Sequence, residues 1–125
     1  RMKKSYEWLD TYCQERPAAE KDFKEEWNAY RYMVGGKMFG MMGHDNEGRH
    51  ILTLKCEPAF GQHLRSTYPE IRPGYYMNKE HWNSVDLDGQ VPDEVLQQMI
   101  DMSHELILGS LSKKKQRELL GEEVK

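Results

Sequence analysis

The sequence predicts a single α+β domain in which an antiparallel β-meander sheet is flanked by an N-terminal helix and a long C-terminal helix. Three observations predict this fold class. The 125 residues fit one domain of ordinary size, strand-like segments in the middle are separated by short turns, and helical apolar periodicity appears near both ends. Because such a sheet needs one face covered, the helices are expected to cover it. We therefore treat residues 1–125 as one domain.

A helix is predicted over residues 3–14. Tyr6, Leu9 and Cys13 recur at three- and four-residue intervals, which is the spacing of one helix face. Pro17 ends the segment, because the residue before a proline disfavours the α conformation. The acidic stretch that follows is expected to be a loop with a solvated surface.

The middle of the chain is predicted to form a meander of three strands. Aromatic and β-branched residues favour strands, and the paired glycines at 35 and 36 are typical of a hairpin turn. A second turn is expected between Asp45 and Gly48, because Asn and Gly adopt positive φ angles at little cost. The predicted strands cover residues 27–34, 37–42 and 49–56.

A short helix and two further strands are predicted next. Pro58 favours the first turn of a helix over residues 58–65, where its missing N–H is not needed. Strands are expected at residues 75–77 and 83–87. The segment 78–82 between them fits a tight bend, a single helical turn or a bulge.

The long C-terminal helix is predicted to open at Pro92. Its apolar residues between 95 and 111 fall at three- and four-residue intervals, so this stripe is expected to face the core. Lys113 to Lys115 are then expected at the C-terminal end of this helix, where cations offset the helix dipole, so a capping role competes there with a binding role.

Composition indicates a soluble cytoplasmic protein that acts as a monomer. The net charge is −3, and no apolar run approaches the roughly 18 residues that a membrane span requires. Lys3 and Lys4 are not followed by an apolar segment, so no secretory signal is expected. Cys13 and Cys56 lie far apart, which favours reduced thiols over a disulfide.

One long stretch is distinctive. Residues 68–94 read "YPEIRPGYYMNKEHWNSVDLDGQVPDE", and together with the earlier "GGKMF" and "LKCEP" they resemble the MmcQ/YjbR family of small bacterial proteins. The resemblance extends over nearly the whole chain. It implies a CyaY-like, double-wing α+β fold and a DNA-binding protein. Glu80 stands where the family pattern is commonly basic.

A DNA-binding protein with net negative charge needs a local basic surface, because Lys and Arg must neutralise phosphates. Strand alternation places Arg49 and Lys55 on one side of their strand, while an aromatic ring offers a stacking surface for a base. Each candidate also has an ordinary structural role, as a solvated charge or a core aromatic. The candidate nucleic-acid-binding residues are Arg31, Lys37, Arg49, Lys55, Arg72, Lys79 and Trp82.

The alternative function is a small-molecule or protein-binding module that uses the aromatic corner between residues 75 and 83. The asparagines there can instead cap a bend, and the histidine can bond a buried carbonyl. The residues of this candidate pocket are Tyr75, Tyr76, Asn78, His81, Trp82 and Asn83.

Catalysis is not predicted. The five histidines show no metal-binding spacing, the cysteines lack an adjacent activating partner, and no phosphate-binding glycine loop is present. An acidic stretch near residues 15–26 is a weak alternative for oxygen-ligand metal binding, because lysines interrupt it. We therefore expect a non-enzymatic protein with no catalytic residues, no cofactor and no metal.

Overall fold

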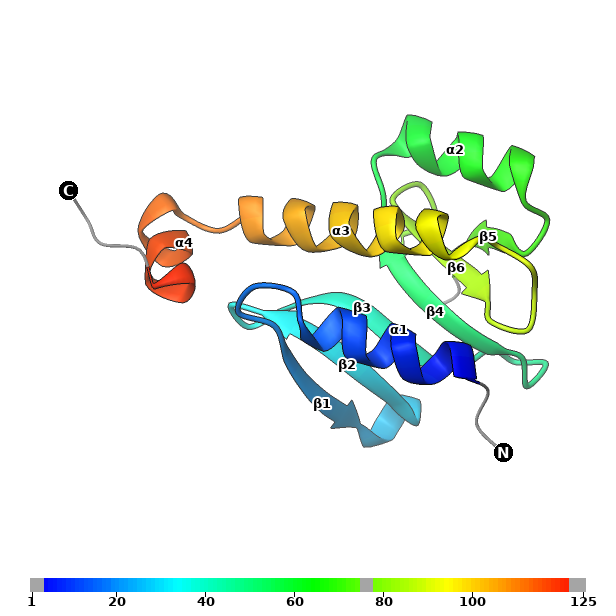
Figure 1. Ribbon diagram of the computed structural model, residues 1–125, viewed down its shortest axis with the longest axis horizontal. Helices are drawn as coiled ribbons and strands as arrows, with labels where there is room; N and C mark the ends of the chain where they lie inside the picture. Colours follow the sequence, from blue (N-terminus) through cyan, green and yellow to red (C-terminus); the bar gives the residue numbers. More distant parts are fainter. Residues whose placement is uncertain (1–3, 75–77, 122–125) are drawn as a thin grey trace.

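The computed structural model describes residues 4–74 and 78–121, and these form one antiparallel sheet with helices packed against it (Figure 1). The predicted α+β fold with an antiparallel meander is confirmed. The strands are β1 (Glu20–Lys24), β2 (Ala29–Val34), β3 (Lys37–His44), β4 (His50–Lys55), β5 (Ile71–Pro73) and β6 (Trp82–Asp86). The helices are α1 (Lys4–Gln14), α2 (Pro58–Thr67), α3 (Asp93–Gly109) and α4 (Lys113–Leu120), with a 3-10 turn η1 (Glu25–Trp27).

The six strands follow the order β1-β2-β3-β4-β6-β5, and every neighbouring pair is antiparallel. Strands β2, β3 and β4 are the predicted meander. The chain then crosses through α2 to the far edge, forms β5 there, and returns inward as β6. Pro73 is tolerated in β5 because this strand lies at the sheet edge.

The prediction of a loop before residue 27 is wrong, because Glu20–Lys24 forms the edge strand β1. Four of its five residues are exposed, so the strand lacks the alternating apolar pattern that would predict it. Trp27 belongs to η1 instead of a strand, and β2 begins at Ala29 after Asn28 adopts a left-handed conformation with φ 50°. The predicted strand at residues 75–77 lies outside the described residues.

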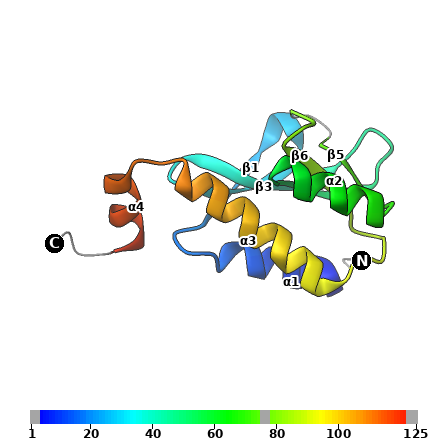
Figure 2. The same ribbon diagram turned by 90° about the horizontal axis from the view of Figure 1, so that it is seen from above.

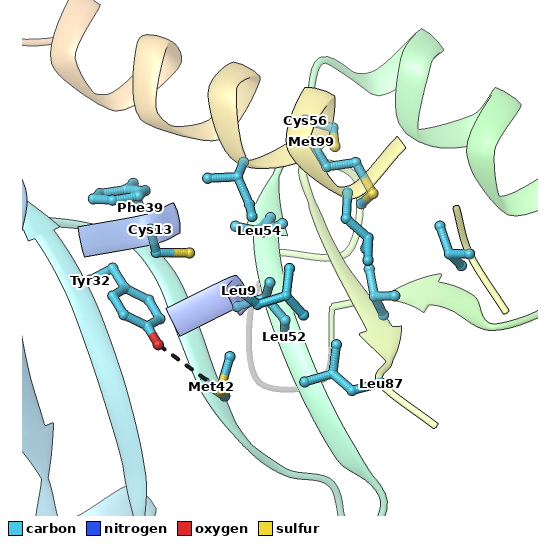
Figure 3. Packing of buried hydrophobic residues seen from close by; sticks show 14 of the residues in the cluster. Leu9, Cys13, Tyr32, Phe39, Met42, Leu52, Leu54, Cys56, Leu87 and Met99 are labelled. Carbon is cyan, nitrogen blue, oxygen red and sulfur yellow. Dashed lines mark hydrogen bonds between the residues drawn. The ribbon is translucent and has the colours of Figure 1, made fainter. Parts of the chain in front are cut away.

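The core lies between one face of the sheet and the helices, with α1 and α3 on the same side (Figure 2). Leu9 and Cys13 of α1 pack with Tyr32, Leu52 and Leu54 of the sheet (Figure 3). Helix α3 contributes further buried residues, as its apolar stripe predicts. Helix α2 adds Leu64 to the same cluster, so α1, α2 and α3 share one face of the sheet, and no helix within residues 4–74 and 78–121 packs on the other face.

The long helix is shorter than predicted, and the placement of the three lysines at its C-terminal end is wrong. Helix α3 ends at Gly109, and Lys113 to Lys115 form the first turn of the separate helix α4. Ser112 caps α4, because its hydroxyl accepts a hydrogen bond from the N–H of Lys115 at 3.1 Å. The three cations therefore lie at the positive end of a helix dipole and not at the negative end.

Helix α4 packs beside the tip of the β2–β3 hairpin (Figure 1). A Cβ atom added at Gly35 would lie 2.5 Å from Leu111 and 3.0 Å from Leu119. Gly35 has φ +59°, so the turn and the close approach of these leucines both require glycine.

Candidate functional site

Five of the seven candidate nucleic-acid-binding residues lie on the face of the sheet opposite the described helices. The register aligns Arg31, Met41, Thr53, Ser84 and Arg72 in one row across five strands. Side chains two residues apart on a strand point to the same face. This face carries Arg31, Arg49, Lys55, Arg72 and Trp82. We call it the open face because no described helix packs on it, although Met41, Thr53 and Ser84 at its centre are buried.

Each arginine of the open face is paired with a carboxylate. Arg31 makes two hydrogen bonds to Asp22, at 2.8 and 2.6 Å. The bond from this guanidinium is the main reason why the pKa of Asp22 lies below its usual value. Arg31 is thus already paired with a carboxylate of the same chain.

The other two arginines follow the same pattern. Arg49 bonds Asp45 at 2.7 Å and also lies 3.2 Å from Glu47. Arg72 lies 3.7 Å from Asp86. Counting Lys55, four cations on this face are matched by four carboxylates, so the open face offers little net attraction for phosphate.

The aromatic corner is largely occupied by structural hydrogen bonds. The side-chain oxygen of Asn78 accepts a hydrogen bond from the N–H of Glu80 at 2.9 Å. The backbone carbonyl of Asn78 accepts a hydrogen bond from the N–H of Trp82 at 2.9 Å. The same carbonyl accepts from the N–H of His81 at 3.3 Å, so the segment forms a single helical turn, one of the three alternatives left open by the sequence. Asn83 is fully buried and accepts a hydrogen bond from Arg65.

The remaining corner residues differ in exposure. Trp82 is half-buried and leaves room only for glycine at position 74, where a Cβ atom would lie 2.7 Å from the Trp82 Cβ. His81 is part-exposed beside Glu80, and Lys79 is exposed in the bend. Tyr75 and Tyr76 lie outside the described residues. The described part of the corner therefore acts mainly to fix the bend.

A different group of cations gathers at the tip of the β2–β3 hairpin. Lys37 is exposed, and its Nζ lies 3.5 Å from the hydroxyl of Ser110, just before α4. Lys113, Lys114 and Lys115 are exposed on the first turn of α4. We call these four lysines the basic end. Among residues 4–74 and 78–121, none of the four forms an ion pair.

The sequence identifies Lys37 as a candidate, and for Lys113 to Lys115 it leaves a helix-capping role and a binding role as alternatives. The residue that could have distinguished a position at a helix C-terminus from one at a helix N-terminus is Ser112, which caps the start of a new helix immediately before the lysines. A serine before a short helix-forming run is a recognisable start signal. Reading it would have placed the lysines at a helix N-terminus.

The cysteines do not supply a reactive thiolate. Both are buried and free. Burial raises the pKa of Cys13 to about 12 and the pKa of Cys56 to about 11, so both remain thiols at neutral pH. Within the described ranges, no three metal-binding side chains come together, and none of the helices there has the length and apolar character needed to cross a bilayer.

The single antiparallel sheet with helices on one face defines a small α+β protein, and comparison with known proteins identifies its family. The model of the family described as YjbR matches residues 14–106. The chain belongs to the YjbR family, as the resemblance predicts.

Individual relatives support the same family membership. The chain is 31% identical over 109 residues to uncharacterized protein YjbR of Escherichia coli strain K12, covering 87% of this chain and 92% of that protein. It is 39% identical over 82 residues to uncharacterized protein YyaQ of Bacillus subtilis strain 168, covering 66% and 67% of the two chains. Their names give no activity.

Solved structures show the same fold. The crystal structure of protein DR2400 of Deinococcus radiodurans, with a DUF419 domain, has a TM-score of 0.81 and 31% identity, covering 94% of this chain and 88% of that one. A crystal structure of a Pseudomonas syringae protein has a TM-score of 0.71 at 23% identity, covering 84% and 98%. The second likeness concerns the fold alone.

Proposed function

We propose that this protein binds DNA in the cytoplasm, without catalysis, through the basic end formed by Lys37, Lys113, Lys114 and Lys115. The observation that carries the proposal is the gathering of four exposed lysines without ion-pair partners in the described part of the chain. Unpaired cations release the counter-ions of DNA when they bind phosphates, and this release drives association.

The open face is the weaker candidate for the same role. Its arginines would have to leave bound carboxylates, as Arg31 would leave Asp22, before they could neutralise phosphates. Each exchange replaces one ion pair by another and therefore contributes little binding free energy. The basic end requires no such exchange, so the proposal concerns that surface.

The placement of the lysines at a helix start also supports anion binding. The N–H groups of the first helical turn carry partial positive charge, which adds to the charge of the lysines. Lys113 to Lys115 lie beyond residues 14–106, which the family model matches. The proposal is therefore specific to this chain and does not extend to every member of the family.

Buried free cysteines support the proposed compartment, and neither thiol is available as a nucleophile. Reduced thiols are usual in a reducing cytoplasm, and both thiols here are held protonated by burial. A binding function uses neither of them.

The test is fluorescence anisotropy of a labelled DNA duplex at two salt concentrations, with wild type and two matched triple variants. The variant Lys113→Gln, Lys114→Gln, Lys115→Gln is expected to bind at least about tenfold more weakly at low salt. Its salt slope should fall by about 2 to 3, since each phosphate contact contributes about 0.9.

The matched control is Arg31→Gln, Arg49→Gln, Arg72→Gln, which changes the net charge by the same amount on the open face. It is expected to bind nearly as well as wild type. Equal losses in both variants would mean that only net charge matters. A greater loss in the control, or no saturable binding by wild type at low salt, would contradict the proposal.

A further inference from the structure

A pocket of about 440 Å³ lies beside α1, at the end of the β2–β3 hairpin away from its tip. Its size falls within the usual range for small-molecule sites, about 300 to 1,000 Å³. It is separate from the basic end and from the aromatic corner. The lining side chains used below are Asp10, Lys21, Phe23, Tyr30, His44 and His50.

Flat rings form much of the wall. Phe23 and Tyr30 face each other across β1 and β2, with ring centres 5.0 Å apart in an edge-to-face arrangement. Both residues remain 46% exposed, although aromatic side chains are usually buried by packing. These rings therefore offer uncovered apolar surface to a molecule in the pocket.

The histidines provide a second flat surface. His44 and His50 are cross-strand partners, and their rings stack 4.3 Å apart at an interplanar angle of 5°. Burial, and then the neighbouring His44, lower the pKa of His50, while Asp88 acts in the opposite direction. The stacked pair thus favours the uncharged form of His50 at neutral pH.

Polar groups converge at another part of the wall. Asp10 accepts hydrogen bonds from the hydroxyl of Tyr32 at 2.7 Å and from Lys21 at 2.8 Å. Lys21 also lies 4.4 Å from the centre of the Tyr30 ring. The charges of Asp10 and Lys21 cancel, so the pocket has hydrogen-bonding groups but no net charge to attract an ion.

We propose that this pocket binds an uncharged, planar heteroaromatic molecule of about the size of a purine base or an indole. Its ring would contact Tyr30 and the stacked histidines, and its polar edge would bond Asp10 or Lys21. Aromatic contact explains the exposed rings, and the cancelled charges explain the preference for a neutral ligand over an anion or a cation. The proposal does not depend on DNA binding, because it involves none of the lysines of the basic end.

The test is a titration of the ¹⁵N-labelled protein, followed by NMR, with adenine, with indole and with cyclohexanol as a neutral non-aromatic control. We expect saturable shifts of amides near Tyr30 and His44 with adenine or indole and weaker binding of cyclohexanol. Loss of ring stacking in Tyr30→Leu or His44→Gln should weaken binding by about three- to tenfold.

Trp27→Leu is the matched control, because Trp27 is an exposed aromatic residue that does not line the pocket. It should leave the affinity unchanged. His44 is exposed, so His44→Gln keeps the test informative if Tyr30→Leu disturbs folding. The absence of shifts with both aromatic probes, equal binding of cyclohexanol, or equal weakening by Trp27→Leu would overturn the proposal.

Discussion

Ser103 joins helix α3 to two strands at the point where their hydrogen-bond ladder ends. Its hydroxyl donates to the carbonyl of Phe39 on β3 at 2.5 Å and accepts from the N–H of Lys55 on β4 at 2.8 Å. The register of β3 with β4 runs only as far as Gly40 and Leu54 on this side. The hydroxyl therefore supplies the partners that the ladder no longer provides.

Ser103→Ala is expected to destabilise the protein by about 2 to 4 kcal/mol, because it leaves a buried carbonyl and a part-buried N–H without their partner. Urea unfolding measures the change. Ser66→Ala is the control, since Ser66 is exposed and its hydroxyl bonds only the carbonyl of His63. Similar losses in the two variants would show that the Ser103 bridge has no special importance.

His50 makes stability depend on pH. Its folded-state pKa is lowered from the ordinary value of 6.5, first by burial and then by His44. The unfolded chain therefore binds more protons below pH 6.5, and stability should fall as the pH decreases from about 7.5 to about 5.5.

The measurement is the urea unfolding free energy of wild type and His50→Gln at these two pH values. In His50→Gln, the unfolding free energy should decrease less between these two pH values than it does in wild type. His63→Gln, at an exposed position of α2, is the control and should retain the full decrease. An unchanged pH dependence in His50→Gln would refute the role of His50.

At the scale of elements, the docking of α4 depends on the glycine turn of the β2–β3 hairpin. Gly35 and Gly36 both have positive φ angles, of +59° and +81°. A Cβ atom at Gly35 would meet Leu111, whereas a Cβ atom at Gly36 would have no neighbour within 4 Å. A comparison of substitutions at the two glycines therefore distinguishes the effect of backbone strain from the effect of packing against α4.

Gly35→Ala is expected to destabilise the protein by about 1 to 3 kcal/mol more than Gly36→Ala, because it adds overpacking to the strain of positive φ. It should also speed amide hydrogen exchange in α4, while Gly36→Ala should not. Equal exchange rates in the two variants would contradict the packing of α4 on the hairpin tip.

The difference between expected and observed elements has a simple physical cause. Helices α1, α2 and α3 and the strands of the meander were predictable because their apolar residues recur with the period of one buried face. Strand β1 escaped prediction because its residues are mostly exposed. Strand β5 has only three residues, too few to show a period.

At the scale of the whole molecule, charge is distributed unevenly although the total is only −3. The arginines of the open face are paired with carboxylates, while the lysines of the basic end have no ion-pair partner among the described residues. The proposed ring-binding pocket lies at the opposite end of the β2–β3 hairpin. The two proposed sites can therefore be altered independently.

The sequence by itself determined the fold class, the family and most of the helices, because periodicity and turn residues are local signals. It also placed Arg49 and Lys55 on one side of their strand through alternation. Only the tertiary structure decided which cations are neutralised, because Arg31 meets Asp22 only when β1 pairs with β2. It likewise decided the pocket, since Asp10, Tyr30 and His44 come from separate elements that meet only in the folded chain.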